Sequence, residues 1–124
     1  MKRIQLTIIT FLLCSFCVFS APKETIVKDI LTEYVTLKME EMQAVIKFDD
    51  EQRAQLQEIE LKFLLDVQKA EVCACFNSQK KVRKLKEKRV QSLQKILTRE
   101  QFIKYDAIEN DRIKEGSLRA EEAN

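Results

Sequence analysis

Hydrophobic side chains recur at helical spacing along four segments that follow residue 22. The segments are residues 23–47, 50–72, 79–96 and 98–116. Their apolar residues lie three or four positions apart, which is the period of an α-helix and not of a β-strand. We therefore predict an all-α fold with four helices, in which the second and third form a long central helical hairpin. One continuous helix over residues 50–96 is the alternative.

The first predicted helix has a wide apolar surface. At 100° per residue its apolar side chains span an arc of about 220°, whereas a helix that buries one face needs a stripe of about 100°. Three charged residues, Lys28, Lys38 and Glu41, fall within this arc. The pattern predicts a helix that is buried on two sides. Either other helices of the same chain cover both sides, or a partner covers one of them.

The starts of the second and fourth helices carry capping residues. Asp49 is a good N-cap with Gln52 three residues later, and Thr98 forms a capping box with Gln101. Gly116 is a natural helix stop. We therefore predict that the helical domain spans residues 21–116 and that residues 117–124 form a flexible tail.

The N-terminus has the layout of a secretory signal peptide. A basic start precedes a mostly apolar stretch over residues 4–19, and short residues lie before Ala21. This arrangement predicts a signal peptide over residues 1–20, with an uncleaved anchor as the alternative. The mature chain then has 104 residues, with twenty basic and twenty acidic groups. A balanced charge behind a signal peptide argues against a nucleic-acid partner.

The composition excludes several kinds of chemistry. The 124 residues include no His, one Gly and one Pro. Without His there is no Ser-His-Asp triad and no imidazole metal ligand. With so little Gly, phosphate-binding loops cannot be built. We therefore expect a binding protein and not an enzyme, with no cofactor and no metal.

Two similar motifs open the capped helices. Leu97-Thr98-Arg99-Glu100-Gln101 matches the LTxxQ signature of the Spy/CpxP family of periplasmic proteins. Phe48-Asp49-Asp50-Glu51-Gln52, which starts 49 residues earlier, looks like a degenerate first copy. The chain resembles this family over most of residues 24–115. The resemblance implies a cradle-shaped antiparallel dimer of helical hairpins in the periplasm, and a role as an ATP-independent chaperone or an envelope stress sensor.

The first and second helices have more apolar surface than one small chain readily covers. We expect a homodimer in which this surplus is partly a dimer interface and partly a surface for unfolded protein clients. A dimer interface without clients is the simpler alternative. A membrane partner would be needed only for the sensor role. The candidate surface residues are Ile30, Tyr34, Leu37, Met39, Leu61 and Leu65.

The third predicted helix is strongly basic outside its apolar stripe. Its lysines and arginines could capture acidic or unfolded clients. The favoured interpretation is a solvated face that pairs with acids of the second helix. Those acids are Glu51, Glu58, Glu60, Asp66 and Glu71.

Cys73 and Cys75 lie near the turn between the second and third helices. Residues at i and i+2 of a helix point to nearly opposite faces, so a disulfide between them needs non-helical backbone. The two cysteines are either small apolar fillers, part of a disulfide within or between chains, or a redox-labile pair. As a Cys-x-Cys switch they would favour the sensor role. A metal site lacks further ligands.

Overall fold

The computed structural model describes residues 23–73 and 77–122, and every regular element in these ranges is an α-helix. The elements are α2 (Lys23–Ile46), α3 (Asp50–Val72), α4 (Ser78–Ile96) and α5 (Arg99–Glu122). The predicted all-α class and its four helices are confirmed. Because α3 ends at Val72 and α4 begins at Ser78, the alternative of one continuous helix is wrong.

The predicted signal peptide over residues 1–20 lies outside the described residues. Within residues 23–73 and 77–122, no helix is long and apolar enough to cross a membrane.

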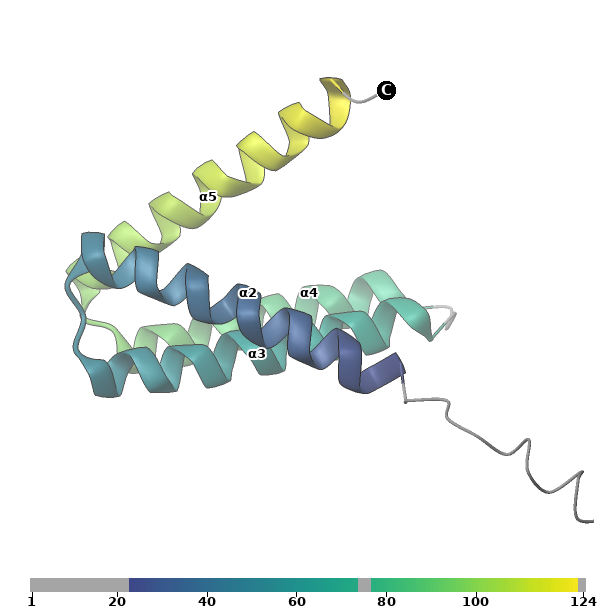
Figure 1. Cartoon of the computed structure of the whole chain (residues 1–124), viewed down its shortest axis with the longest axis horizontal. Coiled ribbons are helices and arrows are strands. Elements are labelled where there is room, and N and C mark those ends of the chain that lie inside the picture. The colour runs from purple at the N-terminus through teal and green to yellow at the C-terminus, as the bar shows by residue number, and fades with distance from the viewer. Residues whose placement is uncertain (1–22, 74–76, 123–124) are drawn as a thin grey trace, which may run out of the picture.

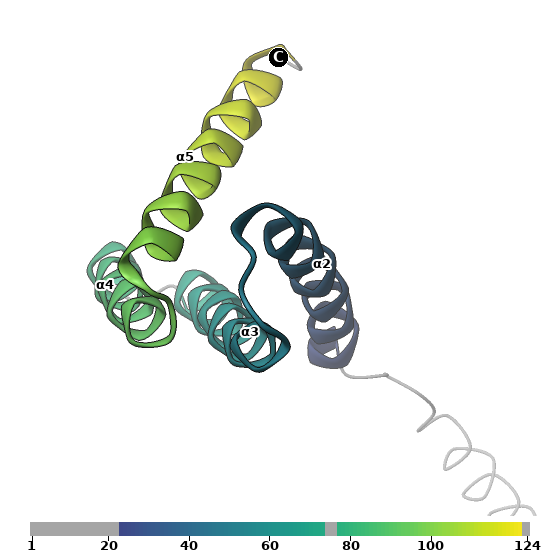
Figure 2. The ribbon, with the colours of Figure 1, turned by 90° about the vertical axis from the view of Figure 1, so that its left-hand side faces the viewer.

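Helices α3 and α4 lie side by side, and α2 packs along α3 (Figure 1). Figure 2 shows α2, α3 and α4 close to end-on, with α5 leaving the end of α4 and projecting away from the other three. The first half of α5 contacts α2 and α4. Arg112 of the second half still pairs with Glu41 of α2, and beyond it α5 extends from the bundle, with Ile113 65% exposed.

The turn from α2 to α3 is built without glycine. Lys47 has a φ of 65°, which is the left-handed conformation that ends many helices. Its N–H still donates to the carbonyl of Gln43 at 3.0 Å. The Gln43 amide in turn donates to the carbonyl of Phe48 at 3.1 Å and to Asp50 Oδ1 at 3.0 Å. One side chain therefore holds both ends of the turn.

The core lies where the helices α2 to α5 meet the two short connections, residues 47–49 and residues 97–98. It combines residues of α2 with single residues from α3, α4, α5 and the two connections. Its members are Val35, Met39, Met42, Ile46, Phe48, Leu56, Leu93, Leu97 and Tyr105.

The C-terminal helix is longer than the sequence predicts. Helix α5 continues through Gly116 to Glu122, so the predicted helix end at Gly116 is wrong. Glycine costs only about 1 kcal/mol in a helix interior. The residues around it include Glu115, Arg119 and Ala120, which are all good helix formers.

Candidate functional site

The wide apolar arc of α2 is divided into a buried half and an exposed half. Val35, Met39, Met42 and Ile46 form the buried half and are at most 3% exposed. The exposed half carries five large apolar side chains that are between 48% and 63% exposed. We call them the α2 stripe: Ile26, Ile30, Tyr34, Leu37 and Val45. The chain itself therefore covers only one side of this helix.

The structure separates the predicted surface residues into two groups. Ile30, Tyr34 and Leu37 belong to the exposed α2 stripe. Met39 is fully buried in the core, so its assignment to an exposed surface is wrong. Met39 lies at the opposite edge of the apolar arc from Leu37, and periodicity alone does not tell which edge the rest of the chain covers.

Leu61 and Leu65 of α3 are half-buried. Leu61 packs against the core, so the chain itself covers part of the apolar surface of α3. This leaves α2 with most of the uncovered apolar surface that the sequence predicts.

A cluster of four charged side chains and one tyrosine joins all four helices. Its members are Lys38 of α2, Glu60 of α3, Arg89 of α4, and Tyr105 and Glu109 of α5. We call it the ionic cluster. Lys38, Glu60 and Tyr105 are at most 3% exposed.

Glu60 lies at the centre of the ionic cluster. Its Oε1 accepts hydrogen bonds from Arg89 Nε and from the Tyr105 hydroxyl, both at 2.7 Å. Its Oε2 lies 3.2 Å from Lys38 Nζ. Each of the other three helices therefore sends one donor to the same carboxylate.

Glu109 forms a second acceptor beside Glu60. Its Oε1 lies 2.6 Å from Lys38 Nζ and 3.1 Å from the Arg89 guanidinium. Lys38 and Arg89 thus each bridge the two carboxylates. Glu109 Oε2 is buried without a hydrogen-bond partner among the described residues. The cluster fixes the first half of α5 to the rest of the bundle.

The environment of the ionic cluster shifts the pKa values of its members. Burial alone would raise the pKa of Glu60, but Lys38 and Arg89, with the hydrogen bonds from Arg89 and Tyr105, hold it below its ordinary value of 4.5. Burial and the Glu60 carboxylate raise the pKa of Tyr105. Burial alone would lower the pKa of Arg89, but the charge and hydrogen bond of Glu60 raise it above its ordinary value. Glu60 and Arg89 are therefore charged, and Tyr105 is neutral, near pH 7.

Sequence reasoning identified this cluster only in part. The sequence placed Lys38 inside an apolar arc and Glu60 opposite the basic helix, and the structure pairs Glu60 with Arg89. Glu109 was missed, although it follows Tyr105 by four residues and so shares its helix face. The other basic side chains of α4 are exposed: Lys80, Lys81, Arg83, Lys84, Lys86, Lys88 and Lys95.

The two capping motifs are formed as predicted, and they also meet each other. Asp49 caps α3 by accepting from the N–H of Gln52 at 2.7 Å, and Thr98 caps α5 by accepting from the N–H of Gln101 at 3.2 Å. The Gln52 amide donates to Gln101 Oε1 at 2.9 Å and to the carbonyl of Ile96 at 3.0 Å. Leu97, the first residue of the second motif, is buried in the core. The motifs therefore join the start of α3 to the start of α5.

Cys73 is the C-cap of α3 and is exposed. Its backbone is extended, with φ −70° and ψ 97°, so the helix has already ended at this residue. Cys75 lies outside the described residues. Within residues 23–73 and 77–122, no group of three or more His, Cys, Asp or Glu side chains could hold a metal ion.

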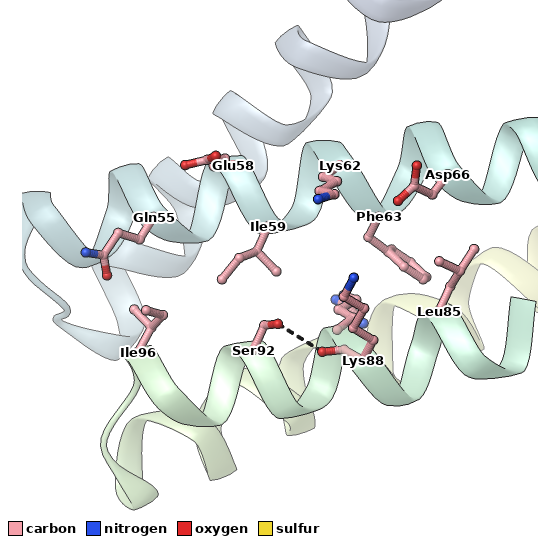
Figure 3. Close-up of a pocket in the computed structure, with 11 residues that line it drawn as sticks. Gln55, Glu58, Ile59, Lys62, Phe63, Asp66, Leu85, Lys88, Ser92 and Ile96 are labelled. Carbon is pink, nitrogen blue, oxygen red and sulfur yellow. Dashed lines mark hydrogen bonds between the residues drawn. The ribbon is translucent and has the colours of Figure 1, made fainter.

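A groove runs between α3 and α4 (Figure 3). In this view the ribbons of α2 and α5 pass behind it. Its volume is about 350 Å³, and Ile59, Phe63, Leu85 and Ile96 form much of its surface. The Arg89 guanidinium lies 5.0 Å from the centre of the Phe63 ring. Arg89 thus connects the groove to the ionic cluster.

No protein-family model, no curated protein and no solved structure matches this chain. Function therefore has to be inferred from the residues and geometry of the chain itself.

Proposed function

We propose that the protein is a periplasmic, ATP-independent chaperone-like protein that binds unfolded or misfolded envelope proteins. The observation that carries this proposal is the exposed α2 stripe. Five large apolar side chains on one helix face form an uncovered apolar surface of the kind that marks protein interaction sites. The resemblance of the two capping motifs to the LTxxQ signature supports the same role.

The α2 stripe suits clients that lack a fixed shape. It consists of four aliphatic side chains and one tyrosine. Binding to such a surface depends on apolar area and not on a particular sequence.

Dimerisation is part of the proposal. A second copy would cover a portion of the α2 stripe and, with α3 and α4 as a helical hairpin in each copy, would form an antiparallel cradle. Sedimentation of the purified mature chain at micromolar concentration should then give the mass of a dimer. A monomer at that concentration would contradict the dimer.

Suppression of aggregation tests the chaperone activity. Light scattering of a denatured test protein should fall when the chain is added at a low molar ratio, without ATP. The paired changes Ile30→Glu and Leu37→Glu should remove this effect, because they place two charges within the α2 stripe.

The matched control adds the same two charges to another face of α2. Thr25 and Thr32 are both exposed and lie outside the stripe. Thr25→Glu with Thr32→Glu should therefore suppress aggregation as the natural chain does. Equal loss in both double variants would contradict a role for the stripe.

A redox sensor that docks on a membrane partner is the second candidate. The observation that favours it is the extended backbone at Cys73, since a disulfide between Cys73 and Cys75 needs non-helical backbone. Absence of aggregation suppression, together with reversible titration of the cysteine pair by an oxidant, would support the sensor over the chaperone.

A further inference from the structure

The groove between α3 and α4 continues into a second hollow toward Cys73. The second hollow has a volume of about 440 Å³ and shares Asp66, Leu85 and Lys88 with the first. The shared residues make one continuous groove along the two helices. On α3 it extends from Gln55 to Cys73, which is about 27 Å at the helical rise of 1.5 Å per residue.

The two ends of this groove differ in chemistry. The first hollow offers an apolar floor of Ile59, Phe63, Leu85 and Ile96, all of them half-buried. The second hollow is basic, because four lysines and a single acid are among the residues that line it. These lysines are Lys69, Lys81, Lys84 and Lys88.

The acidic residues beside the groove do not cancel the difference between its apolar end and its basic end. Glu58 and Asp66 lie four residues before and after Lys62 on α3, close enough to offset its charge, and Asp66 is also the single acid that lines the basic end. Arg89 is already paired with Glu60 and Glu109. On α4, Lys84 and Lys88 face the groove one turn apart, so a positive surplus remains at the basic end.

We propose that the α3–α4 groove binds a single-chain anionic amphiphile, such as an alkyl carboxylate. Its head group would lie between Lys84 and Lys88, where the two hollows meet. Its alkyl chain would lie over Phe63 and Ile59 toward Ile96. The first hollow is within the size range of small-molecule sites, which are mostly apolar with a few placed polar groups. This ligand site is separate from the α2 stripe and does not depend on the proposed chaperone activity.

Calorimetric titration with dodecanoate, below the concentration at which it forms micelles, tests the proposal. The natural chain should show saturable binding. Lys84→Glu with Lys88→Glu should raise the dissociation constant about tenfold or more, because the head group then meets two negative charges. The matched control is Lys80→Glu with Lys86→Glu, two exposed lysines of α4 that line neither hollow. This control variant should keep the dissociation constant within about twofold of that of the natural chain.

Comparison of head groups and chain lengths on the natural chain provides a test without any variant. Dodecyltrimethylammonium has an alkyl chain of the same length with a positive head, and octanoate has the same head with a shorter chain. Both should bind more weakly than dodecanoate. Equal binding of the cationic amphiphile, equal loss in the two double lysine variants, or no saturable binding of dodecanoate would overturn the proposal.

A variant of the α2 stripe separates this site from client binding. Ile30→Glu with Leu37→Glu should leave dodecanoate binding unchanged while it removes aggregation suppression. Loss of both activities in this variant would show that dodecanoate binds at the α2 stripe and not in the groove.

Discussion

Glu60 accepts contacts from all three of the other helices. Lys38, Arg89 and Tyr105 each place a donor within 3.2 Å of its carboxylate. A buried carboxylate is costly without compensating charges, and removal of one partner from a buried ion pair leaves the others uncompensated. The stability of the folded chain therefore depends strongly on this one side chain.

Glu60→Gln should lower the free energy of unfolding at pH 7 by about 3 kcal/mol, since Lys38 and Arg89 would stay buried with less opposing charge. The pKa of Glu60 lies below its ordinary value of 4.5 in the folded chain. Its contribution is therefore complete above about pH 4.5 and is lost as the pH falls through the folded pKa. Urea unfolding at several pH values should show the difference between natural chain and variant shrinking below pH 4.5.

The matched control for this prediction is Glu87→Gln. Glu87 is exposed on α4, so its loss should change the free energy of unfolding by no more than about 0.5 kcal/mol. A Glu60→Gln variant with the same small effect, or a difference that does not shrink as the pH falls below 4.5, would contradict the role given to Glu60.

The two tyrosines of the chain give a second comparison at this scale. Tyr105 is 1% exposed and donates its hydroxyl proton to Glu60, whereas Tyr34 is 48% exposed in the α2 stripe. Tyr105→Phe should cost about 2 kcal/mol, as expected for a buried hydrogen bond to a charged group. Tyr34→Phe should cost less than about 0.5 kcal/mol. Thermal unfolding of both variants checks this, and equal effects would contradict the geometry.

At the scale of elements, the start of α3 is joined to the start of α5. The capping box of α3 and the capping box of α5 meet through Gln52 and Gln101. Each glutamine accepts from the N–H of its own N-cap residue while its amide faces the other glutamine. The two motifs therefore couple the first turn of one helix to the first turn of another.

A double-mutant cycle measures this coupling. Gln52→Ala and Gln101→Ala should each cost about 1 kcal/mol, because each removes half of a capping box. The double variant should cost less than the sum of the single variants, with a coupling energy of about 1 kcal/mol. Strict additivity in urea unfolding would show that the two motifs act independently.

The sequence predicts both capped helix starts and three of the four helix ends to within one residue, and it fails at the end of α5. Asp49 and Thr98 are N-caps in the sequence and in the structure, because a capping box is a local interaction within four residues. Gly116 does not end α5, because glycine only weakens a helix and its neighbours decide the outcome. The glycine-free turn at Lys47 has no such local signature.

At the scale of the whole molecule, periodicity gives the width of the α2 arc but not the half that the chain covers. Lys38 lies within the arc beside the buried half, and its ammonium group reaches Glu60 and Glu109. The partners of Lys38 lie 22 and 71 residues away in the chain. Such pairing arises from tertiary packing, which is why the ionic cluster and the burial of Met39 could not be predicted from local sequence.

The arrangement of the molecule leaves two different surfaces open. The α2 stripe is apolar along its length, whereas the α3–α4 groove is apolar at one end and basic at the other. The ionic cluster links Arg89, which lines the groove, to Lys38 of α2, the helix that carries the stripe. These two surfaces are the basis for the chaperone-like role and for the amphiphile site.

Direct binding of an unfolded polypeptide tests the central claim, that the α2 stripe holds clients. Fluorescence anisotropy of a labelled, permanently unfolded polypeptide should give a dissociation constant for the natural chain. The dissociation constant should rise about tenfold or more for Ile30→Glu with Leu37→Glu. For Thr25→Glu with Thr32→Glu it should stay within about twofold of the natural value. Unchanged binding in the stripe variant, or equal loss in both variants, would contradict the account.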